Sequence, residues 1–223
     1  MAKRDTQQGN GQYRELIDAW EAQQDAYVHY RDQRFAVMID VLEHVVPPDG
    51  TVLDLASGLG SLSRLILERL PSVHCIAVDF DPALLELARH NLTKFGDRAT
   101  VIDGNLKLPD WLQQIDRQPQ AAVSSTALHW LPTPDLMALY QRLADLLAEG
   151  AVFMNADHLD LHQSESLFEL LSISDDTRTQ NQSFESGVFT WEQWWEQVAA
   201  MPELSDLVER RHAQLRDVEA PRQ

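Results

Sequence analysis

The sequence predicts an α/β protein with a doubly wound, mostly parallel sheet, preceded by helices and followed by a helical C-terminal segment. Between residues 51 and 156, short apolar runs alternate with segments whose apolar residues recur every three or four positions. Such alternation is typical of βαβ units, in which right-handed crossovers join parallel strands. The chain has 223 residues, of which 44% are hydrophobic, enough for one domain with an elaboration or two small domains.

The segment before the first strand is predicted to be helical. Residues 1–12 are polar and rich in Gly and Gln, so we expect a flexible N-terminus. From Tyr13 to about Val46 the apolar spacing is helical, and the turn sequence "PPDG" ends the region. The apolar stripe of this region comprises Phe35, Met38, Val41, Leu42 and Val45.

Strands and helices then follow in turn. The expected strands span residues 51–56, 74–80, 99–103, 121–128 and 151–156, and the helices between them span 61–70, 81–96 and 133–150. Asp81 is expected to cap the second helix, with Pro82 at its first position and Gly96 as its stop. Thr133 is expected to cap the third helix, and Gly150 to close it.

The alternation stops after Asp160. Residues 172–187 are polar and are expected to form a mobile loop, and residues 190–215 are expected to be helical. Residues 161–223 should thus form a loop and a helical segment packed on the preceding domain. Three tryptophans share one face of the last helix: Trp191, Trp194 and Trp195. Core packing is the favoured interpretation, and an aromatic wall for an apolar or cationic substrate is the alternative.

Charge and composition narrow the range of partners and compartments. The net charge of −17 disfavours binding to nucleic acid or to an anionic membrane. Cys75, the single cysteine, lies in an apolar segment and is expected to be buried, and no metal-ligand spacing is present. No segment approaches the ~20 apolar residues of a membrane span, and the N-terminal charges precede no apolar run, so a cytoplasmic protein is expected.

The stretch "TVLDLASGLGSLSRLI", residues 51–66, is typical of a strand that runs through a glycine turn into a helix. In open α/β sheets, ligands bind beyond the carboxyl ends of the strands. Neither register of the turn fits the dinucleotide spacing G-x-G-x-x-G, and the Gly-Lys-Ser/Thr ending of a P-loop is absent. A ligand other than a pyrophosphate is therefore favoured, and a nicotinamide oxidoreductase is a weak alternative.

The turn resembles motif I of the class I S-adenosylmethionine-dependent methyltransferases, D/E-x-G-x-G-x-G. Asp54, Ala56, Gly58 and Gly60 occupy the motif positions, and Ser57 lies among them. Ala56 replaces the first glycine, which the turn tolerates if the φ angle there is negative. The resemblance implies a Rossmann-like fold and S-adenosylmethionine as cofactor.

The ends of the next two strands carry further landmarks of this family. The resemblance implies that Asp79 accepts hydrogen bonds from the ribose hydroxyls, with Phe80 beside it. In "VIDGNL" it implies that Asn105 reads the adenine amino group, with Gly104 before it and Leu106 packed on the ring. Asp103 takes the role of Asn105 if the register slips by two residues.

The fourth strand, "AAVSSTALHWL", resembles a subgroup of the family with a Leu-His-Trp segment. The resemblance spans residues 13–160, which should form one cofactor-binding domain. Ser124 and Ser125 would lie near the sulfonium and the methionine moiety. Residues 13–46 would form a helical lid, from which Tyr30 and Arg31 contact the cofactor, the arginine through the methionine carboxylate.

These expectations lead to a functional hypothesis. The chain would transfer a methyl group to O, N or C of a small-molecule acceptor, in natural-product or small-acid metabolism. His129 and His158 are candidate bases, although packing beside Trp130 is an alternative role for His129. The alternative function is cofactor binding without methyl transfer, as a partner subunit or a non-methylating catalyst.

The last two strands of the family's sheet have no counterpart in the sequence after Ala156. The fifth strand would then be an exposed edge, and exposed edges recruit partners. Either the Trp-rich helix or a second subunit would cover this edge, and a homodimer is the hypothesis.

Overall fold

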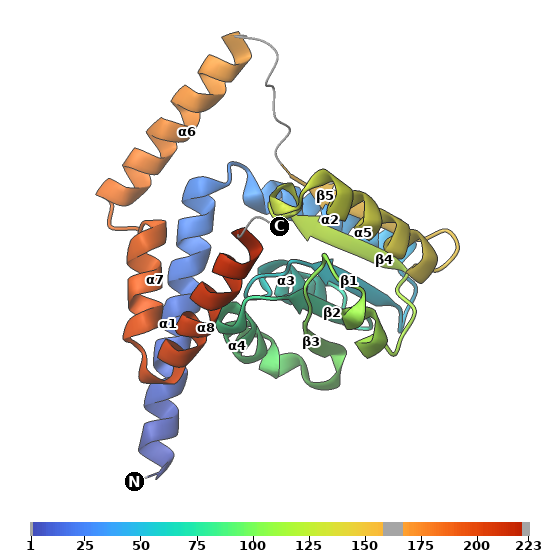
Figure 1. Ribbon diagram of the computed structural model, residues 1–223, viewed down its shortest axis with the longest axis horizontal. Helices are drawn as coiled ribbons and strands as arrows, with labels where there is room; N and C mark the ends of the chain where they lie inside the picture. The colour runs from blue at the N-terminus through green and yellow to red at the C-terminus, as the bar shows by residue number, and fades with distance from the viewer. Residues whose placement is uncertain (1, 158–166, 220–223) are drawn as a thin grey trace. The chain divides into compact units, whose positions relative to one another are not determined.

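The computed structural model describes residues 2–157 and 167–219 (Figure 1). The described chain divides into two compact units. We call residues 2–33 with 167–205 the helical unit, and residues 34–157 with 206–219 the sheet unit. This division differs from the expected single domain over 13–160, because the N-terminal helix groups with helices from the second half of the chain.

The sheet unit contains five parallel strands in the order β3-β2-β1-β4-β5. The strands are β1 (Thr51–Leu55), β2 (His74–Asp79), β3 (Ala99–Asp103), β4 (Ala121–Ser125) and β5 (Val152–Ala156). The predicted α/β class and the positions of all five strands are confirmed, except that β4 ends at Ser125 and Leu128 begins a short 3-10 helix. The strand order reverses at β1, between β2 and β4, and this reversal marks the expected binding edge of the sheet.

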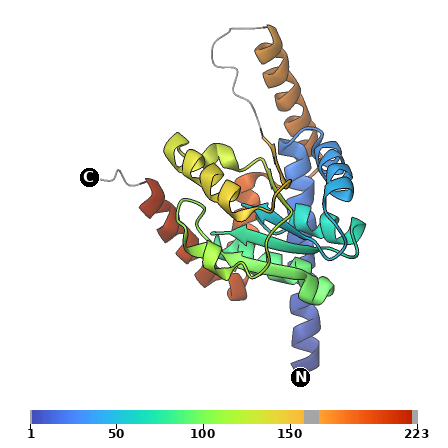
Figure 2. The same cartoon turned by 90° about the vertical axis from the view of Figure 1, so that its right-hand side faces the viewer.

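Helices cover both faces of this sheet. They are α2 (Arg31–Val45), α3 (Ser61–Arg69), α4 (Pro82–Leu92) and α5 (Thr133–Leu146). Residues 206–219 of α8 (Pro202–Glu219) also belong to this unit, and Arg211 of α8 forms an ion pair with Asp81. Successive β1 residues point to opposite faces, so Val52 packs with α2 and α3 whereas Leu53 packs with Leu139 and Leu143 of α5. Figure 2 shows the strands between α5 on one side and α2 and α3 on the other.

Two predicted helix caps have different outcomes. The Asp81 carboxylate accepts hydrogen bonds from the backbone N–H groups of Ala83 (3.0 Å) and Leu84 (3.2 Å), and Pro82 opens α4, as predicted. The prediction for Thr133 is wrong: Pro132 precedes α5 and no side chain caps it. Cys75 is fully buried, as expected, and burial raises the pKa of its thiol.

The helical unit consists of α1 (Ala2–Tyr27), α6 (Leu167–Glu185) and α7 (Trp191–Ala200). Helix α1 begins within the segment expected to be flexible. The prediction of a loop over residues 172–187 is wrong for residues 172–185, because α6 continues to Glu185. The core interpretation of Trp194 is confirmed: its side chain is fully buried, its ring lies 4.7 Å from that of Trp20, and its indole N–H donates to the carbonyl of Leu16 (2.9 Å).

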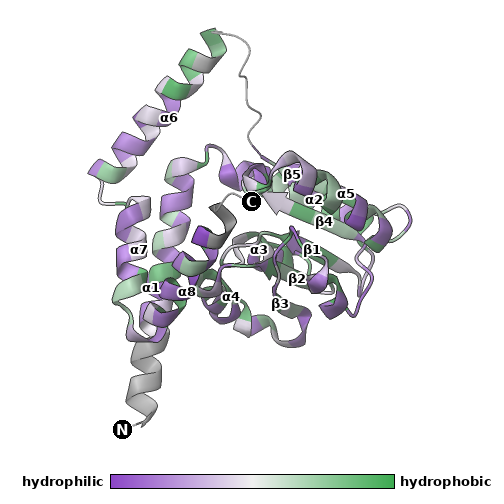
Figure 3. Cartoon of the chain, in the orientation of Figure 1, coloured by the Kyte–Doolittle hydropathy of each residue, from purple (hydrophilic) through white to green (hydrophobic). Residues whose placement is uncertain are grey.

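Apolar residues gather in the first half of α6, as Figure 3 shows. Its exposed apolar side chains are Leu167, Phe168, Leu170, Leu171 and Ile173. None of the helices in residues 2–157 and 167–219 combines the length and the apolar character of a membrane-spanning segment.

Candidate functional site

The turn after β1 has an unusual backbone conformation. The φ angles of Ala56, Gly58 and Gly60 are +53°, +58° and +77°, all in the left-handed region. The turn is fixed to β2 by a hydrogen bond from the Ser57 N–H to the carbonyl of Val78 (3.0 Å). Glycine adopts this region readily, but alanine does so only under strain, because its Cβ approaches the backbone. The condition that made Ala56 acceptable, a negative φ angle, is not met.

Asp54, in β1, is hydrogen-bonded to the helix that follows the turn. The carboxylate is buried in β1, and its Oδ2 accepts hydrogen bonds from the hydroxyl (2.6 Å) and backbone N–H (3.1 Å) of Ser63 in α3. Burial raises the pKa of Asp54 to about 7, against the lowering effect of the Ser63 hydrogen bonds. The first motif residue therefore joins β1 to α3, which shapes the turn between them.

Asp79 lies at the carboxyl end of β2 and faces the same turn. Its Oδ2 accepts from the Gly58 N–H (2.8 Å), and its Oδ1 accepts from the N–H groups of Phe80 (2.8 Å) and Asp81 (2.9 Å). Burial raises the pKa of Asp79 to about 6, although these N–H groups favour the ionised form. A carboxylate has about four acceptor positions, so one remains at Oδ2 for a ligand hydroxyl.

Gly104 follows β3 beside this carboxylate. Its N–H donates to the backbone carbonyl of Asp79 (2.8 Å). A Cβ at Gly104 would lie 2.5 Å from the Cβ of Trp111, so only glycine lets the chain pass there. The absence of a side chain at position 104 thus brings the end of β3 against β2.

The two adenine candidates have different surroundings. The Asn105 Oδ1 accepts from the backbone N–H of Lys107 (3.0 Å), an Asx turn that uses one of its two lone pairs. Asp103 pairs with Asp79 in the sheet register and is exposed. Leu106, expected on the ring, is buried in the core cluster that contains Trp111.

The two serines of β4 differ in their accessibility. Ser124 is fully buried, and its hydroxyl donates to the carbonyl of Leu55 (2.9 Å), which joins β4 to β1. Ser125 is half-buried, and its hydroxyl oxygen lies 3.1 Å from that of Thr126. Ser125 is therefore the one of the two whose hydroxyl lies within reach of a ligand.

The candidate base His129 has a partner that the sequence did not reveal. Its Nδ1 lies 2.7 Å from Oδ1 of Asp157, and its backbone N–H donates to Oδ2 of the same carboxylate (3.1 Å). Asp157 directly follows β5, as Asp79 ends β2, and an acidic residue at a strand end was the available signal. The second candidate base, His158, lies outside the described residues.

Tyr30 and Arg31 belong to the helical unit. Tyr30 lies in the turn between α1 and α2 with a φ angle of +56° and an exposed side chain. The Arg31 guanidinium is buried, with Nη1 2.7 Å from Oε2 of Glu21 and 3.3 Å from Oδ1 of Asp25. Arg31, which the resemblance assigns to the methionine carboxylate of the cofactor, therefore lies beside two carboxylates of the helical unit itself.

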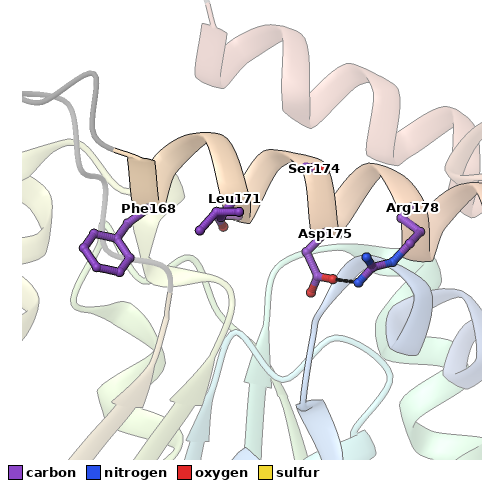
Figure 4. Close-up of a pocket in the computed structure, with 6 residues that line it drawn as sticks. Phe168, Leu171, Ser174, Asp175 and Arg178 are labelled. Atoms are coloured by element: carbon purple, nitrogen blue, oxygen red, sulfur yellow. Dashed lines mark hydrogen bonds and ion pairs between the residues drawn. The ribbon is translucent and has the colours of Figure 1, made fainter.

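A hollow of about 440 Å³ lies along α6, and all the residues that line it come from this one helix (Figure 4). They include Phe168 and Leu171 and the ion pair between Asp175 and Arg178. A ligand site needs groups that converge from several elements, so this surface is not the candidate site. In the described part of the chain, no cluster of His, Cys, Asp and Glu has the arrangement of a metal site.

Two polar groups beside the glycine turn retain hydrogen-bonding capacity for a ligand. The Ser57 hydroxyl is buried and has no hydrogen-bond partner among the described residues, and Asp79 retains one acceptor position. A buried polar atom without a partner is costly unless a ligand supplies one. Both groups flank the turn formed by Gly58 and Gly60.

The region that contains this turn resembles known proteins. Residues 52–150 match the family model described as "Methyltransferase domain". This match covers less than half of the chain. The matched region begins in β1 and continues past α5, so it contains the glycine turn, Asp79 and the β4 end.

The chain also resembles curated methyltransferases that are named for different acceptors. The chain is 32% identical over 149 residues to a trans-aconitate 2-methyltransferase of Sinorhizobium fredii, covering 64% of this chain and 52% of the relative. It is 27% identical over 127 residues to a release factor glutamine methyltransferase of Geobacter sulfurreducens, covering 57% and 43%. The chain spans about half the length of the curated relatives it matches.

Solved structures share the fold of this chain over about two thirds of its length. One is CalS10, an amino pentose methyltransferase from Micromonospora echinaspora solved with S-adenosylmethionine, with a TM-score of 0.53 and 22% identity over 65% of this chain and 58% of that one. Another is Streptomyces venezuelae DesVI, with a TM-score of 0.52 and 17% identity over 68% and 60%. The predicted Rossmann-like fold is confirmed.

Proposed function

We propose that this chain is an S-adenosylmethionine-dependent methyltransferase that acts on a small molecule. The observation that carries the proposal is the hydrogen bond from the Gly58 N–H to the Asp79 carboxylate, which joins the glycine turn and the β2 end into one cradle. The methyltransferase domain match over residues 52–150 supports the same reaction class.

The cradle would hold the cofactor through a small set of groups. Asp79 would accept a ribose hydroxyl at Oδ2, and the Ser57 hydroxyl would meet a polar group of the methionine moiety. Asn105 or Asp103 would accept from the adenine amino group. The bound cofactor supplies an electrophilic methyl group on a positively charged sulfur. The contribution of the chain is to hold acceptor and cofactor in line, which is worth ~7–11 kcal/mol in favourable cases.

His129 would remove the acceptor proton. A neutral imidazole that donates its Nδ1–H to Asp157 presents the lone pair of Nε2 as the base. Asp157 would fix this tautomer and stabilise the imidazolium that forms, because its carboxylate is largely buried beside the ring. The acceptor is then one that must lose a proton, such as an amine or a hydroxyl.

The acidic surface supports a small acceptor over a nucleic acid. A net charge of −17 repels a phosphate backbone, and the trans-aconitate methyltransferase relatives are named for a small acid. The release factor relative is named for a protein acceptor, so the domain match does not fix the acceptor. Tyr30 and Arg31 are the remaining expected cofactor contacts, and we retain them as part of the proposed lid.

We also propose a homodimer that pairs through β5. In the described part of the sheet β5 is an edge strand, and its residues Val152, Phe153 and Met154 are only partly buried. An exposed edge of this kind is prone to pair with another chain. Sedimentation at micromolar concentration should give the mass of two chains, and a monomer would contradict the dimer.

Calorimetry and product analysis test the function together. We expect heat of binding with S-adenosylmethionine and none with NAD. We then expect S-adenosylhomocysteine to accumulate when amine, hydroxyl and carboxylate acceptors are supplied in turn. Binding without turnover across all acceptor classes would favour a non-methylating role, and the absence of binding at millimolar ligand would overturn the proposal.

A further inference from the structure

Asp81 connects the candidate cofactor site to two other parts of the sheet unit. Its backbone N–H donates to Oδ1 of Asp79 (2.9 Å), and its own Oδ1 caps the start of α4. Its Oδ2 accepts from Nε of Arg211 (2.7 Å), which lies 130 residues away in the sequence. A single residue thus joins the carboxylate of the cradle to helix α8.

Arg211 lies on the inward face of α8. Its side chain is 14% exposed and that of Asp81 is 8% exposed, so the ion pair is largely withdrawn from water. Val208, one turn earlier, is buried, whereas Arg210 is exposed. The two adjacent arginines therefore differ in their surroundings although they are chemically identical.

The charge of Arg211 affects the pKa of Asp81 directly and that of Asp79 through Asp81. Burial raises the pKa of Asp81, and the Arg211 guanidinium opposes that rise. Burial is the main cause that raises the pKa of the Asp79 carboxyl, and the negative charge of Asp81 raises it further. A guanidinium that neutralises Asp81 therefore lessens the repulsion felt by an ionised Asp79.

We propose that Arg211 is a positioning residue for the adenosyl site, because its ion pair with Asp81 holds the segment that places the Asp79 carboxylate. This inference rests on the proposed function. Binding of the cofactor and docking of α8 are then linked, and linkage is reciprocal: each strengthens the other by the same factor.

Calorimetry with S-adenosylmethionine tests the link. We expect Arg211→Met to raise Kd about tenfold, within the usual range of coupling between sites, and Arg211→Lys to recover most of the affinity. Arg210→Met is the matched control and should bind like the wild type. With a working acceptor, Arg211→Met should raise KM for the cofactor and leave kcat unchanged.

Asp81→Asn provides a second route to the same contact. Asparagine can still cap α4, so this variant removes the ion pair while keeping the helix start. We expect its Kd to match that of Arg211→Met, and the double variant to be no weaker than either single one. Additive losses in the double variant would contradict the inference.

Hydrogen exchange gives a readout that does not depend on activity. Added S-adenosylmethionine should slow exchange of the amides of residues 206–216 in the wild type and in Arg210→Met, but not in Arg211→Met. If the wild type binds the cofactor and Arg211→Met binds it equally well, the inference is overturned and the proposed function stands. If the wild type does not bind it, the proposed function itself fails.

Discussion

The imidazole Nδ1 of His129 lies 2.7 Å from Oδ1 of Asp157, which directly follows the fifth strand. The carboxylate favours the tautomer that carries its proton on Nδ1. We predict that Asp157→Asn lowers kcat by about 10²-fold, the lower end of the contribution of a positioned base, and leaves the Kd of S-adenosylmethionine unchanged.

The imidazole ¹⁵N shifts of His129 report the same arrangement without turnover. They should show Nδ1 protonated in the wild type and a changed tautomer balance in Asp157→Asn. Asp145→Asn, an exposed acid on α5, is the control. Identical shifts and rates in wild type and Asp157→Asn would contradict a role for the pair in proton removal.

Ala56→Gly is predicted to stabilise the protein. Ala56 has a φ angle of +53°, and relief of that strain outweighs the extra entropy of a glycine in the unfolded chain. We expect the free energy of unfolding in urea to rise by about 0.5–1 kcal/mol. Ala127→Gly is the matched control: its φ angle is −137°, so glycine brings no relief there and should destabilise. If the free energy of unfolding fell in Ala56→Gly by as much as in Ala127→Gly, the backbone at Ala56 would not be strained.

The sequence predicted the strands and helix ends that are determined by residues close together in the chain. The five apolar runs predicted the strands, and Asp81 followed by Pro82 predicted the start of α4, because each signal lies within a few residues. The cap at Thr133 was wrong because Pro132 already fixes the entry to α5. The part of α6 after residue 171 was missed because it is largely polar and has little apolar periodicity, yet no glycine or proline interrupts it between residues 172 and 185.

The site residues that were missed depend on distant contacts. Asp157 meets His129 only because β4 and β5 are paired, and Arg211 reaches Asp81 only because α8 belongs to the sheet unit. The strain at Ala56 comes from a turn whose φ angle the sequence motif does not specify. Sequence spacing therefore predicted the turn and Asp79, but it did not predict Asp157 and Arg211, whose contacts join residues far apart in the chain.

The stability of the sheet unit should rise as the pH falls from 7.5 to 5.5. Burial raises the pKa of Asp54 to about 7 and that of Asp79 to about 6, above the ordinary value of 3.8. In this window the folded chain binds protons that the unfolded chain has released. The stabilisation that these two protonated carboxyls provide is complete below their pKa in the unfolded chain, and it is lost as the pH rises through 6 and 7. For each group the free energy of unfolding changes by up to ~1.4 kcal/mol per pH unit.

Urea unfolding at the two pH values checks this direction. Asp54→Asn removes one of the two groups and should flatten the dependence. Affinity for S-adenosylmethionine should change in the opposite sense and fall below about pH 6, because a protonated Asp79 accepts ribose hydroxyls poorly. Stability that falls between pH 7.5 and 5.5 would show that these carboxyls are not desolvated as described.

Gly104→Ala is predicted to destabilise the chain by about 1–3 kcal/mol, the usual cost of overpacking. The added Cβ would lie 2.5 Å from the Cβ of Trp111 and 3.0 Å from a methyl carbon of Val78, and the former atom cannot move without its backbone. Gly11→Ala, which meets no atom within 4 Å, is the control and should be neutral or stabilising. Equal midpoints in thermal unfolding for wild type and Gly104→Ala would contradict the close approach.

The affinity of Asp79→Asn for S-adenosylmethionine, measured by calorimetry at pH 7.5, tests the central claim most directly. Asparagine keeps the shape of the side chain but has one acceptor oxygen in place of two. Either the Gly58 N–H and the ribose hydroxyl at Oδ2, or the Phe80 and Asp81 N–H groups at Oδ1, therefore lose their acceptor. We predict a Kd at least about tenfold higher, the cost of one charged hydrogen bond, with Asp97→Asn, an exposed acid, unchanged. A Kd for Asp79→Asn equal to that of the wild type would contradict the account.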